Sequence, residues 1–340
     1  MHVIEAENVR DALPKAVKHI LENGQPEMTR VGTAIVAPEP VTINYRKPKQ
    51  HVLLNPVRDA NPFFHLMEAM WMLAGRDDSA FLDNYIKDFG KNYGKDGVVM
   101  DAYGQRWRHG HRYDQLHEIA NRLRKDPTTR QCVLQMWGAG RDDLRAYSAI
   151  PCNLVATFRI YNGTLDMTVF NRSNDLIWGC CGANAVHFPI MQEYLAGRIG
   201  VELGQYWQVT TNLHLYDAHI DIFSKRVHAA SHENIDYYLG DKNERYGLTQ
   251  SLMQFPLIFD EELETLLSHI DEMHESREQG IFLDSISNPF LRNTVAPMAI
   301  AHHMHKLKET EAAFKFMEAV EAEDWQRAGT EWLERHNGTR

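Results

Sequence analysis

The sequence contains few cysteines and no long apolar run. Four cysteines occur among its 340 residues and none are spaced as a CxxC pair, so a disulfide scaffold is not expected. No segment reaches the ~18–20 consecutive apolar residues that a membrane-spanning helix requires. The first stretch, MHVIEAENVRDALPKAV, carries early acidic residues and no apolar centre, unlike a secretory signal. We therefore expect a globular protein of a reducing cytoplasm.

An excess of positive charge is also absent. The chain has 36 Lys and Arg against 46 Asp and Glu, a net charge of −10, which argues against a protein that wraps a nucleic-acid backbone. A small phosphorylated ligand stays compatible, because a few local arginines suffice for one phosphate. The 18 histidines show no HExxH spacing, so no metal site is expected. The cluster His302, His303 and His305 is interpreted as a solvated face in preference to a metal site.

Glycine motifs of nucleotide-binding loops are missing as well. Neither GxGxxG nor GxxxxGK[ST] occurs, so a dinucleotide or P-loop site has no support. Strands are expected within 29–55 and 128–170, with a hairpin at Asn162-Gly163, and again over 206–216. Helical spacing predicts helices over 8–23, from Pro62 to Gly75, over 183–200 and over 307–335. Strands in the middle with helices on either side predict an α+β fold. We expect one domain over 1–340, with a C-terminal helical extension from about 306.

Among the cysteines, Cys152 is the candidate nucleophile. Cys132, Cys180 and Cys181 lie in apolar segments and are expected to be buried. Cys152 follows Pro151 where an irregular stretch enters a strand, so its thiol is expected to be partly exposed. A thiolate there needs a cationic neighbour to lower its pKa. From spacing alone, a packing role is the alternative.

The segment NRSND (171–175) places an arginine and a hydroxyl before a glycine-rich turn, GCCGAN (179–184), and a helix. An arginine, a hydroxyl and a helix N-terminus close together suit a phosphate or a carboxylate. The alternative is a helix cap with a surface arginine. Asn184, directly after the turn, has the same alternative as a cap residue.

Six segments, taken in order, carry a family resemblance: YGQRWR (103–108), TRQCVLQMW (129–137), IPCN (150–153), NRSND (171–175), GCCGAN (179–184) and NLHLY (212–216). Over about residues 28–220 they resemble thymidylate synthase and its relatives, which include the deoxypyrimidylate hydroxymethylases of bacterial viruses. The resemblance implies a central, mostly antiparallel sheet packed by helices, with one sheet face at a homodimer interface. It implies transfer of a one-carbon unit from 5,10-methylenetetrahydrofolate to C5 of a deoxypyrimidine monophosphate, without a metal, in the host cytoplasm if the source is viral.

The resemblance assigns the nucleophile and the phosphate ligands. Cys152 matches the cysteine that adds to C6 of the pyrimidine and makes C5 a carbon nucleophile. Arg172 matches the arginine that binds the 5′-phosphate beside that sulfur, and Ser173 matches a further phosphate ligand. Arg30 resembles a mobile arginine on an early loop. Arg130 resembles an arginine that reaches the phosphate of the partner subunit, although the second arginine usual in that motif is a glutamine here.

Other matches concern the sugar, the proton transfers and the folate. His214 and Tyr216 match the pair that binds the sugar 3′-hydroxyl. Glu68 matches a buried glutamate that organises waters and proton transfer, which explains an acid inside an apolar helix. Tyr103 matches a tyrosine implicated in the same proton traffic. Asp175 matches the aspartate that binds the pterin ring.

Departures from the family pattern indicate the product. Thymidylate synthases have a tryptophan-rich segment before the YGxxW motif, which shields the exocyclic methylene intermediate until hydride arrives. The corresponding stretch here, IKDFGKNYGKDG, contains Phe89 and Tyr93 and no tryptophan. The charged C-terminal helix also differs from the short apolar tail of the family. Both differences favour capture by water and a hydroxymethyl product, with methylation as the alternative.

Asn184 indicates the base. Its amide can donate to O4 and accept from N3–H of uracil, whereas cytidylate hydroxymethylases of the family typically have aspartate there. The turn before Asn184 is one residue longer than usual, and Asn153 replaces a histidine near the exocyclic group of the base. We therefore predict deoxyuridylate, with deoxycytidylate as the alternative. A nucleotide-binding protein without catalysis is the non-enzyme alternative.

Overall fold

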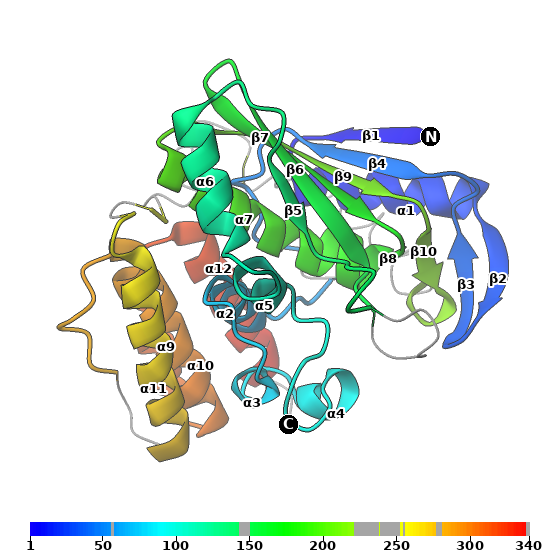
Figure 1. Ribbon diagram of the computed structural model, residues 1–340. Coiled ribbons are helices and arrows are strands. Elements are labelled where there is room, and N and C mark those ends of the chain that lie inside the picture. Colours follow the sequence, from blue (N-terminus) through cyan, green and yellow to red (C-terminus); the bar gives the residue numbers. More distant parts are fainter. Residues whose placement is uncertain are drawn as a thin grey trace.

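A six-stranded mixed sheet forms the centre of the protein (Figure 1). The computed structural model describes residues 1–55, 58–142, 150–220, 238, 252–253, 256–276 and 281–337. In spatial order the strands are β1 (His2–Ala6), β4 (Val41–Tyr45), β9 (Glu202–Thr210), β7 (Thr164–Asn171), β6 (Asn153–Tyr161) and β5 (Val133–Gln135). Strand pairs β4·β9, β6·β7 and β5·β6 are antiparallel, and β1·β4 and β7·β9 are parallel. The predicted α+β class with a mostly antiparallel central sheet is confirmed.

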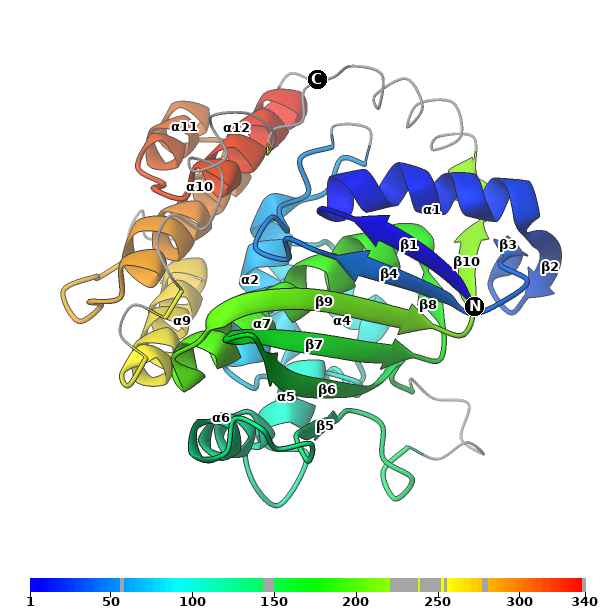
Figure 2. The ribbon, with the colours of Figure 1, turned by 90° about the horizontal axis from the view of Figure 1, so that it is seen from above.

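Alternation along the strands divides the sheet into two faces. Ala156, Phe158, Met167 and Val169 are buried, because they point toward the helices α1 (Val9–Asn23) and α7 (Asn184–Ile199), which pack on this side (Figure 2). The side chains between them point to the opposite face, which no described helix covers. The period of two that predicted these strands therefore also divides them into a packed and an open side.

A second, four-stranded sheet was not predicted. Its order is β2 (Gln25–Thr29), β3 (Gly32–Val36), β10 (Leu213–Tyr216) and β8 (Asn174–Asp175). The single strand predicted over 206–216 is wrong, because the chain breaks at Thr211, whose N–H and hydroxyl both donate to main-chain carbonyls at the end of β7. The break sends β9 and β10 into different sheets. Strand structure predicted within 29–55 ends at Tyr45.

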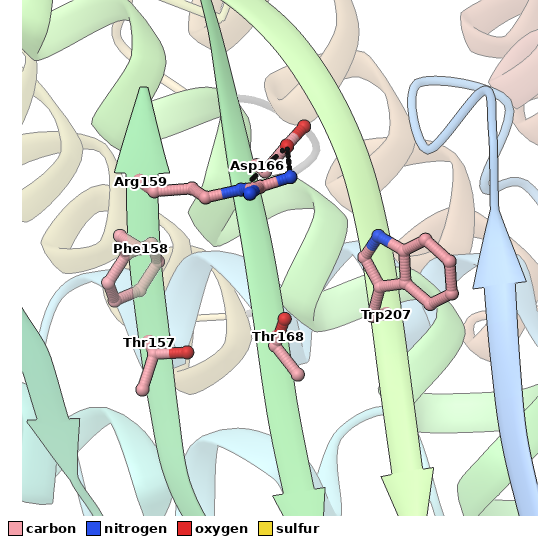
Figure 3. Close-up of a pocket in the computed structure, with 6 residues that line it drawn as sticks. All are labelled: Thr157, Phe158, Arg159, Asp166, Thr168 and Trp207. Atoms are coloured by element: carbon pink, nitrogen blue, oxygen red, sulfur yellow. Dashed lines mark hydrogen bonds and ion pairs between the residues drawn. The ribbon is translucent and has the colours of Figure 1, made fainter. Parts of the chain in front are cut away.

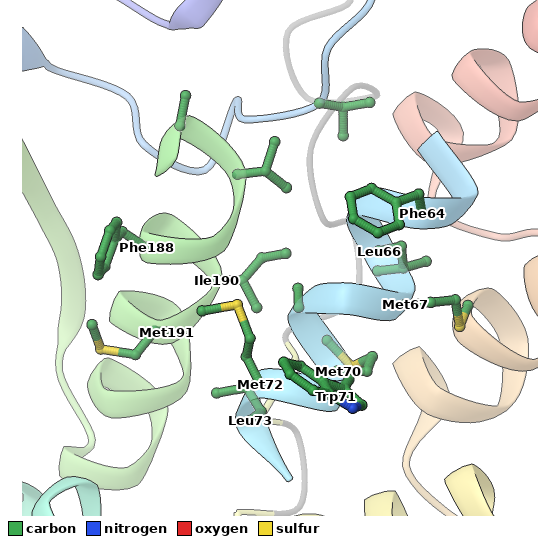
Figure 4. Packing of buried hydrophobic residues seen from close by; sticks show 14 of the residues in the cluster. Phe64, Leu66, Met67, Met70, Trp71, Met72, Leu73, Phe188, Ile190 and Met191 are labelled. Atoms are coloured by element: carbon green, nitrogen blue, oxygen red, sulfur yellow. The ribbon is translucent and has the colours of Figure 1, made fainter. Parts of the chain in front are cut away.

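The buried helix α2 (Pro62–Leu73) connects the sheet to the C-terminal helices. Its cap is Asn61, whose side chain accepts from the N–H of Phe64, and every residue of α2 except Glu68 is buried. Figure 4 shows its apolar side chains packed between α7 and the following helices. Helix α5 (Tyr103–Arg108) crosses α2 closely, since a Cβ at Gly104 would lie 2.1 Å from the carbonyl oxygen of Met72. That glycine therefore sets the position of Tyr103 over the sheet.

Local signals predicted several other elements correctly. Helix α1 begins after its cap Asn8 and ends at Gly24, and the β6–β7 hairpin turns at Asn162 and Gly163, both with positive φ. Helix α7 runs over 184–199 despite Pro189. The glycine-rich turn predicted over 179–184 is shorter than expected. The segment η1 (Leu176–Ala183) is π-helical, and its backbone leaves helical geometry at Cys181 and Gly182, where a kink leads into α7.

The remaining helices lie mainly after the sheet. They are α3 (Ser79–Asp83), α4 (Phe89–Tyr93), α6 (Gln115–Lys125), α9 (Phe259–Ser276), η2 (Leu291–Val295), α10 (Ala296–Lys306), α11 (Thr310–Glu318) and α12 (Glu323–Asn337). The one helix predicted over 307–335 is thus two helices. None of the described helices is long and apolar enough to cross a membrane.

The histidines of α10 are mostly buried, so the predicted solvated face is wrong. His302 and His303 are each only 4% exposed. The ring of His302 stacks on Tyr85 at 4.9 Å between centroids, and Nδ1 of His303 lies 3.2 Å from Nδ1 of His274. The C-terminal helices cover this face of α10. The burial of these histidines cannot be inferred from the pattern of charges in the sequence.

Candidate active site

One cavity of about 770 Å³ brings together almost all of the predicted site residues. It lies where β6, β8 and β10 meet α2, α4, α5, η1 and α12. The predicted residues that line it are Arg30, Glu68, Phe89, Tyr103, Cys152, Asn153, Arg172, Ser173, Asp175, Asn184, His214 and Tyr216. Arg130 is exposed and does not line the cavity. Its predicted role toward a partner subunit therefore stays a prediction.

Cys152 lies at the entrance of β6 with a half-buried side chain. The preceding segment 143–149 is outside the described residues. Tyr103 fixes this turn, since its hydroxyl oxygen accepts from the N–H groups of Cys152 at 2.9 Å and Asn153 at 3.2 Å. Arg172 donates from Nε to the carbonyl of Pro151 at 2.9 Å and from Nη2 to that of Ile150 at 2.7 Å. The guanidinium is therefore held beside the nucleophile strand.

The electrostatics of the thiol differ from the expectation. Burial raises the pKa of Cys152, Arg172 opposes that shift, and the carboxylate of Asp101 adds to it. Arg172 is the expected cation, but burial raises the pKa of the thiol by more than Arg172 lowers it. The thiol is therefore protonated in the resting site.

Three charged residues that line the cavity were not predicted: Arg58, Asp59 and Asp101. Asp101 lies two residues before Tyr103, and burial raises the pKa of its carboxyl. Arg58 is 6% exposed, and its guanidinium lies 4.4 Å from the ring centroid of Trp178. Burial lowers the pKa of Arg58 to about 10. Asp101 could have been suspected from its place beside the YGQRW segment, whereas Arg58 carries no local signal.

His214 and Asp175 come side by side in the parallel pair β8·β10. Nδ1 of His214 lies 3.2 Å from Oδ1 of Asn212, and its ring meets that of Tyr216 edge-on at 5.0 Å. Asp175 caps η1, because its Oδ1 accepts from the N–H groups of Ile177 at 2.8 Å and Trp178 at 2.6 Å. Its other oxygen, Oδ2, is buried without a partner among the described residues. An unpaired carboxylate oxygen in an aromatic-lined cavity fits the N–H edge of a pterin.

Tryptophans reach the cavity from elements other than the one where the family carries them. Trp71 of α2, Trp178 of η1 and Trp332 of α12 all line it. Phe89, at the expected place, is 7% exposed, whereas Tyr93 is 61% exposed. The ring of Trp332 stacks on His336, with centroids 3.9 Å apart. The C-terminal helix thus forms part of the cavity wall.

A buried network of side-chain amides lines the inner end of the cavity. Gln208 Nε2 donates to the backbone carbonyl of Cys180 at 3.0 Å, so Oε1 of Gln208 must point the other way. That oxygen accepts from Nδ2 of Asn174 at 3.0 Å and of Asn184 at 3.1 Å. Nδ2 of Asn184 also lies 3.3 Å from Oδ1 of Asn174.

The network continues to the strand that carries the nucleophile. Asn153 and Asn184 face one another, with Nδ2 of Asn153 3.3 Å from Oδ1 of Asn184 and the reverse pair at 3.2 Å. Oδ1 of Asn153 also accepts from Nδ2 of Asn171. Asn184 is therefore not a helix cap, since its side chain bonds to other amides. Because the series begins at a backbone carbonyl, the orientation of every amide follows from one fixed acceptor.

Glu68 forms a second buried polar group, with histidines. Its Oε2 lies 3.3 Å from Nε2 of His187, and the two side chains are 16% and 5% exposed. Burial raises the pKa of Glu68 to about 8, and Asp101 contributes to the shift. Nδ1 of His65, one turn before Glu68 in α2, is buried nearby without a hydrogen-bond partner among the described residues.

Comparisons with known proteins identify the family of the chain. The thymidylate synthase family model matches residues 12–254. The chain is 39% identical to a deoxyuridylate hydroxymethyltransferase of Pseudomonas phage M6, covering 98% of this chain and 94% of that protein. The chain is also 39% identical to a deoxyuridylate hydroxymethyltransferase of Bacillus phage SP01. That match covers 54% of this chain and 51% of the phage protein. A thymidylate synthase of Buchnera aphidicola subsp. Acyrthosiphon pisum (strain Tuc7) is 25% identical over 63% of this chain. The chain belongs to the thymidylate synthase family.

Proposed function

We propose that the protein hydroxymethylates C5 of deoxyuridine monophosphate, with 5,10-methylenetetrahydrofolate as the one-carbon donor. The carrying observation is the single cavity in which the Cys152 thiol, the Arg172 guanidinium and the amides of Asn153 and Asn184 converge. The names of the two phage relatives support the same reaction. The substrate is a free nucleotide, the reaction needs no metal, and the protein acts in the cytoplasm of the host cell.

The reaction begins at Cys152. Its thiol releases its proton to solvent as the sulfur adds to C6 of the pyrimidine, and the electron pair of the C5–C6 bond moves toward C4 and O4 as an enolate. Arg172, Ser173 and Arg30 hold the 5′-phosphate, and His214 and Tyr216 hold the sugar. The folate, when bound, supplies the one-carbon unit that C5 attacks. Asp175 orients its pterin through the unpaired Oδ2.

The later steps determine the product. Loss of the C5 proton and departure of tetrahydrofolate leave an exocyclic methylene on C5 of the covalent nucleotide. Water adds to that carbon and loses a proton, the electrons move to O4, and expulsion of Cys152 from C6 restores the C5–C6 double bond. Glu68 and Tyr103 both line the cavity, and we assign these proton transfers to them. Tetrahydrofolate leaves unoxidised, in contrast to methylation.

The orientation of the amides supports uracil as the base. Turning Asn184 over would place its carbonyl oxygen against three acceptor oxygens, those of Asn153, Asn174 and Gln208. The amide nitrogen of Asn184 is thus used inside the network, and Oδ1 keeps one free lone pair. That lone pair suits N3–H of uracil, whereas N3 of cytosine is an acceptor and would be repelled. The second N–H of Asn153 is then available for O4.

We also propose that the protein works as one domain and as a homodimer. A single hydrophobic cluster extends from α1 to α12. The open face of the sheet carries a shallow hollow lined by Thr157, Arg159, Thr168 and Trp207 (Figure 3). Together with the 37% exposed Phe170, this face suits a second copy. Sedimentation analysis should show a dimer. The Arg130→Ala variant should bind the nucleotide more weakly and should remain a dimer.

To test the function, the purified protein is incubated with deoxyuridylate and methylenetetrahydrofolate. The mass of the nucleotide product is then measured by mass spectrometry. We expect 5-hydroxymethyldeoxyuridylate with no dihydrofolate formed. The three cavity tryptophans are the observation that favours methylation, so a methyl product with equimolar dihydrofolate would contradict the proposal. A Cys152→Ala variant that binds nucleotide but forms no product is the matched control.

A further inference from the structure

Three polar atoms at the contact between α2 and α7 form no hydrogen bond within the part of the chain that the structure describes. They are Nδ1 of His65, Oε2 of Glu68 and Nε2 of His187, and all three are buried. Apolar side chains of both helices fill the rest of this contact (Figure 4). A buried polar atom without a partner is unfavourable, so these three atoms require a partner that they share.

The spacing of the residues brings the three side chains together. His65 and Glu68 are three positions apart in α2 and therefore share a face of that helix. His187 is three positions after Asn184 in α7, so it lies on the same side of the helix as an amide that lines the cavity. One ligand atom from each of His65, Glu68 and His187 lies within 4.8 Å of the others. We call these three residues the α2–α7 cluster.

The members of the cluster do not satisfy one another directly. Oε2 of Glu68 and Nε2 of His187 are 3.3 Å apart, yet the pair is not aligned as a hydrogen bond. A hydrogen bond to water spans about 2.7–3.2 Å, so one water molecule can contact all three groups. Buried waters typically make about three hydrogen bonds to polar groups that otherwise lack partners. The geometry of the cluster therefore fits one bound water.

The cluster is continuous with the active-site cavity. His65 and Glu68 both line the cavity, and the side chain of Glu68 is 16% exposed. His187 does not line it, and its side chain is only 5% exposed. A water held by the three groups is therefore reached from the cavity and fixed from the protein side.

We propose that the α2–α7 cluster binds the water molecule that captures the exocyclic methylene, so that His65 and His187 determine the product together with Glu68. The binding of the water is independent of the reaction. Its use as the nucleophile rests on the proposed hydroxymethylation and deepens it, because it assigns the source of the hydroxyl oxygen to a site built by two histidines.

The site does not depend on which histidine nitrogen carries a proton. A neutral imidazole has a lone pair at one ring nitrogen and an N–H at the other, whereas water has two O–H donors and two lone pairs. The water can therefore turn to match either tautomer of His65 and of His187. A direct bond between two of the side chains would require one particular tautomer and would leave the third group without a partner.

The capture step uses this water as follows. C5 is bonded to C4 and C6, so its methylene lies between the base edge assigned to Asn153 and Asn184 and the sulfur of Cys152. A lone pair of the water forms the bond to the methylene carbon, and the electrons of its double bond to C5 move to O4. The water passes one proton to Glu68, the residue to which the proton transfers are assigned. Collapse of the enolate then expels the sulfur from C6.

A divalent metal ion is the competing occupant of the cluster. Two imidazoles and a carboxylate are a ligand set for Zn²⁺. Water agrees better with the proposed reaction, which consumes a water molecule in this cavity and needs Glu68 to exchange a proton. A carboxylate bound to a metal ion is not free to do so.

The first test measures how the methylene intermediate is divided between two nucleophiles. 2-Mercaptoethanol, added to the full-length enzyme during turnover, can add its sulfur to the same carbon and give a thioether. In His65→Leu and in His187→Leu the ratio of thioether to hydroxymethyl product should rise by roughly tenfold or more, because the water is no longer held in place. KM for the nucleotide and the rate of adduct formation at Cys152 should be little changed.

Conservative variants and a control separate this effect from a general disturbance. An asparagine can place a polar atom near Nδ1 of His65 and a glutamine near Nε2 of His187, so His65→Asn and His187→Gln should restore most of the wild-type ratio. His302 is 4% exposed, and its Nδ1 also lacks a partner within the described residues, but it does not line the cavity. His302→Leu should leave the ratio unchanged.

The second test needs no turnover. A crystal structure of the full-length protein without substrates should show one ordered water in contact with all three members of the cluster. The double variant His65→Leu, His187→Leu should lack that water. If the Leu variants do not fold, the structure of the wild-type protein decides alone. A wild-type enzyme that forms a methyl product would contradict the proposed function, while the crystal structure would still decide the water site.

Three results would overturn the proposal. One is an unchanged product ratio in folded His65→Leu and His187→Leu. Another is a crystal structure in which no water contacts the cluster. The last is a stoichiometric zinc ion in the purified protein, measured by mass spectrometry of the metal, that is lost in His65→Leu.

Discussion

Two buried polar regions meet in the active-site cavity, and they differ in how their hydrogen bonds are satisfied. In the amide network, every link from the backbone carbonyl of Cys180 through Gln208 and Asn184 to Asn153 pairs a donor with an acceptor. At the other region, Glu68, His65 and His187 each have a buried atom that forms no hydrogen bond within the part of the chain that the structure describes. The first region is neutral, whereas the second contains Glu68, whose pKa is raised by burial to about 8. We therefore propose that the first region recognises the base and that protons are transferred at the second.

Cys152 lines the same cavity and is the proposed nucleophile, so its loss should have the largest effect. Cys152→Ala is expected to lower kcat by at least about 10⁴-fold, because no other group can activate C5. Deoxyuridylate binding should change only a few-fold, since the phosphate, sugar and base contacts are intact. Single-turnover kinetics and calorimetric titration measure the two quantities. Activity within a few-fold of the wild type would refute the assignment of the nucleophile.

Glu68→Gln should disrupt only the region formed by Glu68, His65 and His187. We expect kcat to fall by roughly 10²–10⁴-fold, the usual effect of losing a positioned acid or base. The preference for uracil over cytosine should be retained, because the amide network is not touched. Rates with both nucleotides measure this. A variant that keeps its rate but loses base selectivity would contradict the division of roles.

The same variant should also change how stability depends on pH. The folded pKa of Glu68 is raised from 4.5 to about 8, so the folded state binds the extra proton in this window. Stability is therefore full below pH 4.5 and falls as pH rises toward 8, by at most roughly 5 kcal/mol for this group. Glu193 and Asp324 are raised in the same direction, to about 7 and about 6. The difference between wild type and Glu68→Gln in urea unfolding isolates the share of Glu68, and parallel curves would contradict its raised pKa.

Asn184→Asp should break the amide network. A carboxylate there faces the acceptor oxygens of Asn153, Asn174 and Gln208, so we expect about 1–3 kcal/mol of lost stability. kcat/KM for deoxyuridylate should fall by about 10²-fold, and the ratio of deoxycytidylate to deoxyuridylate turnover should rise. Competition kinetics measure the ratio. An unchanged preference would mean that Asn184 does not read the base.

Gln208→Met should have a smaller effect on the same network. It removes the acceptor that fixes the orientation of Asn184 without introducing a charge. We expect roughly a tenfold loss of discrimination between the bases, with kcat for deoxyuridylate reduced less. Gln205→Met on the same strand is the control, because the side chain of Gln205 accepts from Asn44 and takes no part in the network. Equal discrimination in both variants would show that the base is not read through the network.

Local sequence patterns were sufficient for the elements that depend on local forces. The cap at Asn8, the hairpin at Asn162-Gly163 and the proline start of α2 each follow from the conformational preference of a few neighbouring residues. The motif resemblance added the candidate site residues, nearly all of which line one cavity. These features are encoded within short segments or in their order.

Features that depend on long-range packing were not predictable in this way. The amide network joins residues of β6, β7, β8, β9 and α7, and no local pattern marks Gln208 as a member. The contact of Glu68 with His187 joins residues 119 positions apart, which only the packing of α2 on α7 reveals. Trp332 and His336 reach the cavity because the last helix packs against α2, a contact that the pattern of that helix alone does not identify.

The most direct measurement offers the enzyme both nucleotides at once. Equal concentrations of deoxyuridylate and deoxycytidylate, with methylenetetrahydrofolate, would be turned over and the products identified by mass spectrometry. A fixed amide network and a water-capturing acid predict 5-hydroxymethyldeoxyuridylate with little modified deoxycytidylate and no dihydrofolate. Hydroxymethyldeoxycytidylate as the main product would contradict the reading of the base, and a methylated product with dihydrofolate would contradict capture by water.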